Sequence, residues 1–211
     1  MYQDFSKEWM VTGRSVWYIC GNYAHEKAIE LVEESRKLFN LKTVKIEELP
    51  DLRCIALEPK VSFQFEIPLE DKTNENSFNG TLYEVGAVKN DDYEQLVNMV
   101  VMQYLDEPFY ADLRTKQQLG YVVYCRYRVT QDVVQNIFCV QSPQHAAEYL
   151  ASCINKFLIE KRVDINKISD EDFETIRGAV HTIIAEKDIK LSYESNRFWN
   201  EIAKHKYNFK K

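Results

Sequence analysis

Short apolar runs predict five β-strands along the chain. Residues 61–69 (VSFQFEIPL) alternate between apolar and polar side chains, which is typical of a strand with one solvent-facing side. Four further segments are rich in β-branched and aromatic residues: 15–20, 81–88, 121–129 and 133–141. Only three residues, Thr130 to Asp132, separate the last two segments. We therefore expect these two strands to form a hairpin.

Apolar residues at helical spacing predict helices between and after the strands. Residues 25–39 place one apolar stripe opposite Glu, Lys and Arg side chains. A helix beginning at Asp91 is expected to end at Pro108, which can serve as the first residue of a second short helix. Later helices are expected to begin at Ser142-Pro143 and, with a capping-box-like opening, at Ser169. The last helix is predicted to cover Tyr193 to Lys206.

The order of these elements indicates the fold class. Strands cluster in the middle of the chain, and long helices accumulate after them. This order favours an α+β fold, an antiparallel sheet with helices packed on one face, over alternating βαβ units. The irregular stretch 40–59 separates a strand–helix segment from a larger unit that begins near Val61.

Composition and charge narrow the function classes. The 211 residues carry a formal net charge of -6, and basic residues cluster only at the C-terminus, which argues against a nucleic-acid partner. No membrane-spanning run and no secretory h-region occur, so we expect no membrane association. Five cysteines without any C-x-x-C spacing favour reduced thiols and a cytoplasmic protein. Cys125 and Cys139 could face each other across the hairpin.

The histidines do not complete a metal site. His25 begins a pattern like H-E-x-x-H, but Ile29 stands at the second histidine position. His145 and Glu148 have the spacing of the inverted H-x-x-E-H helix, but Tyr149 replaces its second histidine. A catalytic zinc site needs three protein ligands. Nucleophile elbows and phosphate-binding loops are also missing, so the sequence predicts no cofactor in this chain and no complete active site.

The segment LRTKQQLGYVVY (residues 113–124) holds the strongest candidate site. Arg114 ends the short helix and Tyr121 opens a strand, and Gly120 is expected to supply the sharp turn between them. A guanidinium and a phenol at one corner of the sheet could donate to a peptide carbonyl or a developing oxyanion. Alternatively, Arg114 caps carbonyls or pairs with Asp112, and Tyr121 is a core ring.

Several segments resemble one known family. EPFYADLRTKQQLGYVVY (residues 107–124) closely resembles the hallmark segment in the C-terminal half of insulysin- and nardilysin-type zinc metallopeptidases, which form the pitrilysin superfamily. WYICGNYAHEKAIELVEE, SFNGTLYEVGA, VQSPQHAAEYLASCINKFL and FWNEIAKHKYNF also resemble segments of these enzymes. The resemblance implies that residues 1–45 form the end of the third family domain and that residues 46–60 form a connector. Residues 61–211 would then form most of the fourth domain, without its last strands.

The resemblance also implies a role for the candidate site. In this family the first domain holds zinc and the general base through H-x-x-E-H, a segment absent here, and the metal activates water for attack on a peptide bond. The fourth domain's Arg and Tyr contact the peptide near the scissile carbonyl, and these roles fall on Arg114 and Tyr121. Both are thus expected to bind substrate and the transition state, without a complete catalytic site in this chain. The sequence YCRYRVTQDVVQN is closer to the nardilysin than to the insulysin version of the hairpin.

The expected partners follow from the same resemblance. They are peptide substrates and the N-terminal catalytic half of a parent chain. A homo-oligomer formed through exposed edges is a further possibility. The alternative function is that of a peptide-binding or scaffold segment in a catalytically inactive relative.

Overall fold

The computed structural model describes residues 2–9, 11–39, 41–50, 53–55, 57–87 and 93–210. The chain divides into two compact units, one formed by Met1–Leu52 with Lys187–Lys211 and the other by Arg53–Glu186. Within the described ranges, every helix is too short or too polar to cross a bilayer. The division of the chain into two consecutive family domains stays a prediction.

The larger unit contains a three-stranded antiparallel sheet. Its strands are β3 (Ser77–Ala87), β4 (Val122–Thr130) and β5 (Val133–Ser142), in the order β3-β5-β4. Gln131 and Asp132 join β4 to β5, and both have positive φ, 46° and 65°, as a tight two-residue hairpin turn requires. The predicted hairpin is therefore confirmed.

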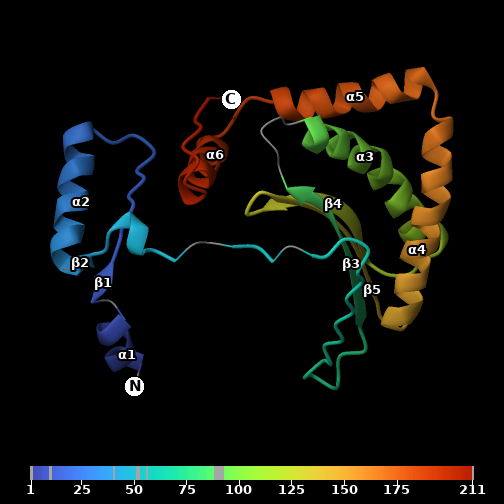
Figure 1. The fold of residues 1–211 in the computed structure, drawn as a ribbon, viewed down its shortest axis with the longest axis horizontal. Helices are drawn as coiled ribbons and strands as arrows, with labels where there is room; N and C mark the ends of the chain where they lie inside the picture. The colour runs from blue at the N-terminus through green and yellow to red at the C-terminus, as the bar shows by residue number, and fades with distance from the viewer. Residues whose placement is uncertain are drawn as a thin grey trace. The chain divides into compact units, whose positions relative to one another are not determined.

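Helices cover one face of this sheet, as Figure 1 shows for α3 (Tyr93–Phe109) and α4 (Ala147–Asp164). A short 3₁₀-helix, η3 (Ile165–Lys167), leads from α4 to α5 (Asp170–Ala185), which packs on α3. The α+β class with helices on one face is therefore confirmed.

Three phenylalanines lie at the centre of the core. The Phe109 ring of α3 makes edge contacts with Phe138 of β5 and Phe157 of α4, at centroid distances of 5.5 and 5.2 Å. Leu150 and Ile154 of α4 are fully buried beside them. The apolar residues that recur at helical spacing along α4 thus form its buried face. This packing fixes the C-terminal end of α3 against the sheet.

A pair of amides joins α3 to the central strand. The side chains of Asn98 and Asn136 each donate one hydrogen bond to the other, with N···O distances of 2.9 and 2.8 Å. Asn98 is buried, so its polar atoms need such partners within the protein. The reciprocal pair fixes the position of α3 along the sheet.

Two helix starts can be compared with their predictions. Ser169 is the N-cap of α5, and its hydroxyl accepts the Asp172 amide at 3.1 Å, which confirms the predicted cap. The helix expected at Ser142-Pro143 begins later, at Ala147. Ser142 instead ends β5, and its hydroxyl accepts the amides of Gln144 and His145 in the turn before the helix.

The smaller unit holds α1 (Tyr2–Trp9), α2 (His25–Phe39), α6 (Leu191–Ala203) and the 3₁₀-helix η1 (Ile46–Glu48). A parallel pair of two-residue strands, β1 (Thr12–Gly13) and β2 (Lys42–Thr43), completes it. The helices predicted over 25–39 and near 193–206 are confirmed, although α6 begins and ends slightly earlier.

The predicted strand over 15–20 is wrong. This segment has no strand pairing, and aromatic contacts fix it in place instead. Tyr18 lies 6.4 Å from the rings of both Phe198 and Trp199 in α6, and Trp17 lies 6.3 Å from Phe39. Aromatic side chains favour strands, but here they pack against helices.

The predicted strand over 61–69 is also wrong. These residues form no strand, and the side chains of Phe65 and Ile67 are 84% and 89% exposed. Alternation predicts a strand only where a neighbouring strand pairs with the backbone and a core covers the apolar side. Among the described residues, β3 pairs with β5 alone.

The expected break at Pro108 does not occur. Helix α3 continues through Pro108 to Phe109 and then widens into the π-helix η2 (Tyr110–Lys116). Proline has no amide hydrogen to donate to the carbonyl one turn earlier, so a regular α-helical bond is missing at this position. The expected second helix is therefore a π-helical extension of the first.

Candidate functional site

The π-helix η2 positions Arg114. Leu113 of η2 is fully buried, as is Phe109 just before it, so these two side chains fix one face of the helix against the core. Arg114 follows Leu113 directly and is only partly exposed. Single π-helical segments occur frequently at functional sites, where they direct a side chain away from a regular helical position.

A tight turn connects η2 to strand β4. The Gln117 amide donates to the Asp112 carbonyl at 2.9 Å, and the Leu119 amide donates to the Leu113 carbonyl at 3.0 Å. Gln118 has a positive φ of 53°, a conformation that reverses the chain direction. The sharp turn is therefore at Gln118 and not, as predicted, at Gly120.

Gly120 has a different role in this segment. A Cβ atom at this position would overlap the carbonyl oxygen of Gln141 and would lie 2.8 Å from its carbonyl carbon. Only glycine allows the backbone to approach β5 so closely. The contact places Tyr121 directly before β4 and beside the end of η2.

Arg114 and Tyr121 lie together at this corner of the sheet. The guanidinium carbon of Arg114 is 5.6 Å from the centroid of the Tyr121 ring, within the range of a cation–π contact. Tyr121 is 85% exposed, so it is not a core ring. The Asp112 carboxylate accepts from the side-chain amide of Gln117 at 3.1 Å, and the Arg114 guanidinium lies against Tyr121. The structure thus brings the two predicted residues together.

One polar atom of Arg114 has no partner. Its Nε is buried and makes no hydrogen bond, although a buried donor of this kind ordinarily has an acceptor. The Tyr121 phenol, by contrast, is exposed to solvent beside it. Together the side chains present a fixed positive charge and an O–H donor, which suits a carbonyl, a carboxylate or an oxyanion.

Two further arginines follow on β4. Arg126 and Arg128 are two residues apart, so they lie on the same face of the strand, opposite to the helices, and both are exposed. Sequence reasoning missed them, although the alternating pattern C-R-Y-R-V carries the signal.

Tyrosines on the same strand stay neutral. A hydrogen bond with Cys139, followed by burial, raises the pKa of Tyr124 above its ordinary value. Burial raises the pKa of Tyr127. Because neither phenol ionises near neutral pH, they add no negative charge beside Arg126 and Arg128.

The cysteines form no disulfide, and all five are free. In the register of β4 and β5, Cys125 lies opposite Phe138, and Cys139 lies opposite Tyr124. Cys125 and Cys139 are therefore on opposite faces of the sheet. The arrangement considered from the sequence, in which they face each other across the hairpin, does not occur. Burial, together with the nearby Asp106 carboxylate, raises the pKa of Cys125 to about 12.

The metal-ligand patterns also remain incomplete in the structure. Within the described ranges, no three His, Cys, Asp or Glu side chains lie close enough to hold a metal ion. His145 precedes helix α4, and its ring is 4.9 Å from the Tyr149 ring. His145 and its neighbours therefore do not provide a zinc site, which the resemblance assigns to another domain of the family.

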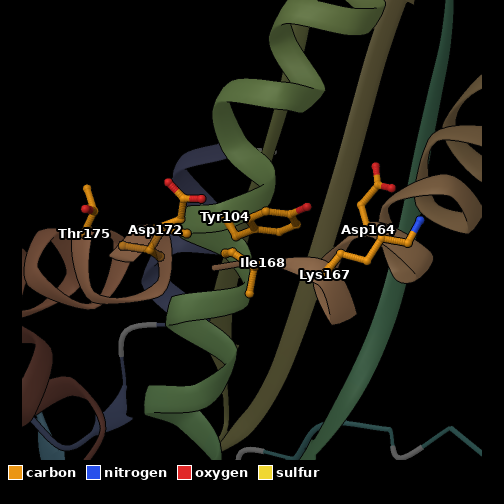
Figure 2. Close-up of a pocket in the computed structure, with 7 residues that line it drawn as sticks. Tyr104, Asp164, Lys167, Ile168, Asp172 and Thr175 are labelled. Atoms are coloured by element: carbon orange, nitrogen blue, oxygen red, sulfur yellow. The ribbon is translucent and has the colours of Figure 1, made fainter. Parts of the chain in front are cut away.

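A hollow of about 370 Å³ lies elsewhere in the larger unit, where Tyr104 of α3 faces η3 and α5 (Figure 2). Two carboxylates line it, but each already has a partner. Asp164 pairs with Lys161 at 3.2 Å, and Asp172 accepts the Ser169 hydroxyl at 2.7 Å. Nothing in the sequence pattern pointed to this hollow.

Comparison with known proteins places this geometry in a family. Residues 100–199, which include Arg114 and Tyr121, match the family described as PQQ synthase PqqF-like, C-terminal lobe domain 4. The fold is similar to the crystal structure of pitrilysin, with a TM-score of 0.69 and 19% identity, over 90% of this chain and 19% of that chain.

Curated relatives agree with this match. A Schizosaccharomyces pombe protein named "Putative zinc protease mug138" is 31% identical over 90% of this chain and 19% of its own length. The Arabidopsis thaliana protein "Nardilysin-like" is 35% identical and the Homo sapiens "Insulin-degrading enzyme" 36% identical, each over 51% of this chain and 10% of the relative. The chain spans about a fifth or less of the length of these relatives. It belongs to the pitrilysin superfamily, in which it corresponds to a segment of the C-terminal lobe.

Proposed function

We propose that this chain supplies peptide-substrate and transition-state contacts to a zinc metalloendopeptidase. In this proposal Arg114 and Tyr121 are the contacting residues, and the metal and the general base come from polypeptide outside these 211 residues. The observation that carries the proposal is the pairing of an exposed phenol with a guanidinium that retains a buried, unpartnered Nε.

The chemistry of the two side chains supports this role. As water adds to a peptide bond, negative charge develops on the carbonyl oxygen. Donors held in place before the reaction stabilise that charge without a cost of reorganisation. The core contacts of η2 position the backbone of Arg114, and the close approach of Gly120 to β5 positions the backbone of Tyr121. The two side chains then lie against each other. The guanidinium supplies positively charged N–H donors, and the phenol supplies one further O–H donor.

The test is the rate of peptide hydrolysis by the complete peptidase with Tyr121→Phe. This change removes the hydroxyl and keeps the ring against Arg114. We expect kcat to fall by about ten- to a thousandfold, the range for losing one oxyanion donor. Tyr149→Phe, on the half-exposed start of α4, is the matched control and should leave the rate unchanged. An unchanged rate for Tyr121→Phe would refute the role.

Partners and location extend the proposal. We infer that the chain packs with the N-terminal catalytic half of its parent. We also infer a cytoplasmic location, because five free thiols suit a reducing compartment. Self-association through exposed edges is tested by the solution mass of the complete protein. A mass equal to one chain would exclude it.

A further inference from the structure

Strand β4 is an edge of the sheet. It pairs with β5 on one side, and no described segment pairs with its other side. In a hairpin with a two-residue turn, the residues flanking the turn exchange hydrogen bonds, and hydrogen-bonded pairs then alternate along the strands. Thr130 and Val133 flank this turn. Consequently the odd-numbered residues of β4, from Val123 to Val129, direct their backbone N–H and C=O groups toward the free edge.

The two arginines lie beside this edge. Arg126 and Arg128 extend from the face of β4 opposite to the helices, and both are exposed. The Arg126 guanidinium is 5.0 Å from the Tyr124 ring, and Arg128 donates through Nε to Gln135 at 2.8 Å. These contacts orient both side chains without neutralising them, because neither forms an ion pair with a described residue. The edge therefore carries positive charge in a chain whose net charge is -6.

The edge is continuous with the Arg114–Tyr121 corner. Tyr121 directly precedes β4, so a chain lying along the free edge would reach the corner at one end. At about 3.3 Å per residue, Arg126 lies about 17 Å and Arg128 about 23 Å along the strand from Tyr121.

We propose that an extended peptide adds as a fourth strand to the free edge of β4, with acidic side chains facing Arg126 and Arg128. Backbone hydrogen bonds provide affinity in this mode of recognition, and side-chain contacts provide selectivity. The acidic residues lie about five and seven positions from the residue whose carbonyl meets Tyr121. This inference rests on the proposed function, because it takes the peptide to be the substrate.

The first experiment measures binding without hydrolysis. A metal chelator stops hydrolysis by the complete peptidase, and fluorescence anisotropy measures its affinity for labelled 16-residue peptides. This length is about twice the number of residues that separate Tyr121 from Arg128, so each peptide can extend along the edge in either direction from its central bond. One peptide carries Glu five and seven positions from the central bond, and its partner carries Gln there. The double variant Arg126→Gln with Arg128→Gln should lower the affinity for the Glu peptide about three- to tenfold, as expected for the loss of two exposed charge pairs. Its affinity for the Gln peptide should equal that of the wild type.

Two controls distinguish an effect of where the charges lie from an effect of charge alone. Arg177→Gln removes an arginine on α5 that is paired with Glu174, and it should affect neither peptide. Moving both Glu residues to the other side of the central bond should abolish the advantage over the Gln peptide. Equal binding of the two Glu peptides would mean that charge alone attracts them, and would overturn the proposal.

A second experiment tests the backbone contacts. Only alternate residues of an added strand direct their amides toward β4. Single N-methyl groups along the peptide should therefore weaken binding about tenfold or more at every second position and have little effect between them. Loss of affinity without this alternation would overturn strand addition. If alternation holds while Tyr121→Phe retains full turnover, the proposed catalytic role fails and the binding mode stands.

Discussion

The backbone of Gly120 approaches strand β5 so closely that a Cβ atom there would overlap the carbonyl oxygen of Gln141. The same atom would lie 3.2 Å from the Cα of Ser142, so no small side-chain movement could make room for it. This contact joins the end of η2 to the sheet and sets the separation of Arg114 and Tyr121.

Gly120→Ala should therefore destabilise the protein. Forcing a methyl group against backbone costs about 1–3 kcal/mol, as other overpacked substitutions do. Urea denaturation measures the change in the free energy of unfolding. Gly178→Ala is the matched control, because nothing lies within 4 Å of a Cβ at that position in α5. It should stabilise the protein by about 0.5–1 kcal/mol. Equal effects of the two substitutions would contradict the close approach.

The amide pair between α3 and β5 makes a second prediction. Asn98→Ala leaves the Asn136 amide without its reciprocal partner in a partly buried position. Such a loss costs about 1–3 kcal/mol of unfolding free energy. The double variant Asn98→Ala with Asn136→Ala should cost clearly less than the sum of the two single variants. Additive costs in thermal or urea unfolding would show that the two amides do not stabilise each other.

Cys125 makes the stability depend on pH in alkaline solution. Its pKa is raised from 9.0 to about 12 in the folded protein, chiefly by burial, so the folded state keeps the proton longer than the unfolded state. The stabilisation is therefore fully present below pH 9 and is lost between pH 9 and about 12. Over this window the stability advantage of the wild type over Cys125→Ala should shrink by up to about 1.4 kcal/mol per pH unit. An advantage that stays constant with pH would contradict this account.

The sequence correctly predicted those elements in which the local residue pattern agrees with the packing in the folded protein. The hairpin of β4 and β5 has both the turn and the apolar runs, and α4 buries the stripe that its spacing predicts. Residues 15–20 and 61–69 have strand-like composition but lack a pairing strand among the described residues. Local composition cannot supply such a partner, because strand formation depends on contacts distant in sequence.

The candidate site shows the same limit at the level of single residues. Arg114 and Tyr121 were predicted as a pair, and the structure places them in contact. Their contact depends on the π-helical turns after Pro108 and on the positive φ of Gln118, and neither feature has a clear pattern in the sequence. Gly120 was predicted to supply the sharp turn, but its observed role is the close approach to Gln141, a strand residue 21 positions later in the chain.

The most direct test of the central claim is a double-mutant cycle on kcat/KM for peptide hydrolysis by the complete peptidase. The cycle combines Arg114→Gln with Tyr121→Phe. If both side chains donate to one developing oxyanion, each single change lowers kcat/KM, and the double change costs clearly less than the product of the two. Rates equal to wild type for either single variant, or costs that multiply independently, would contradict a shared contact with the substrate.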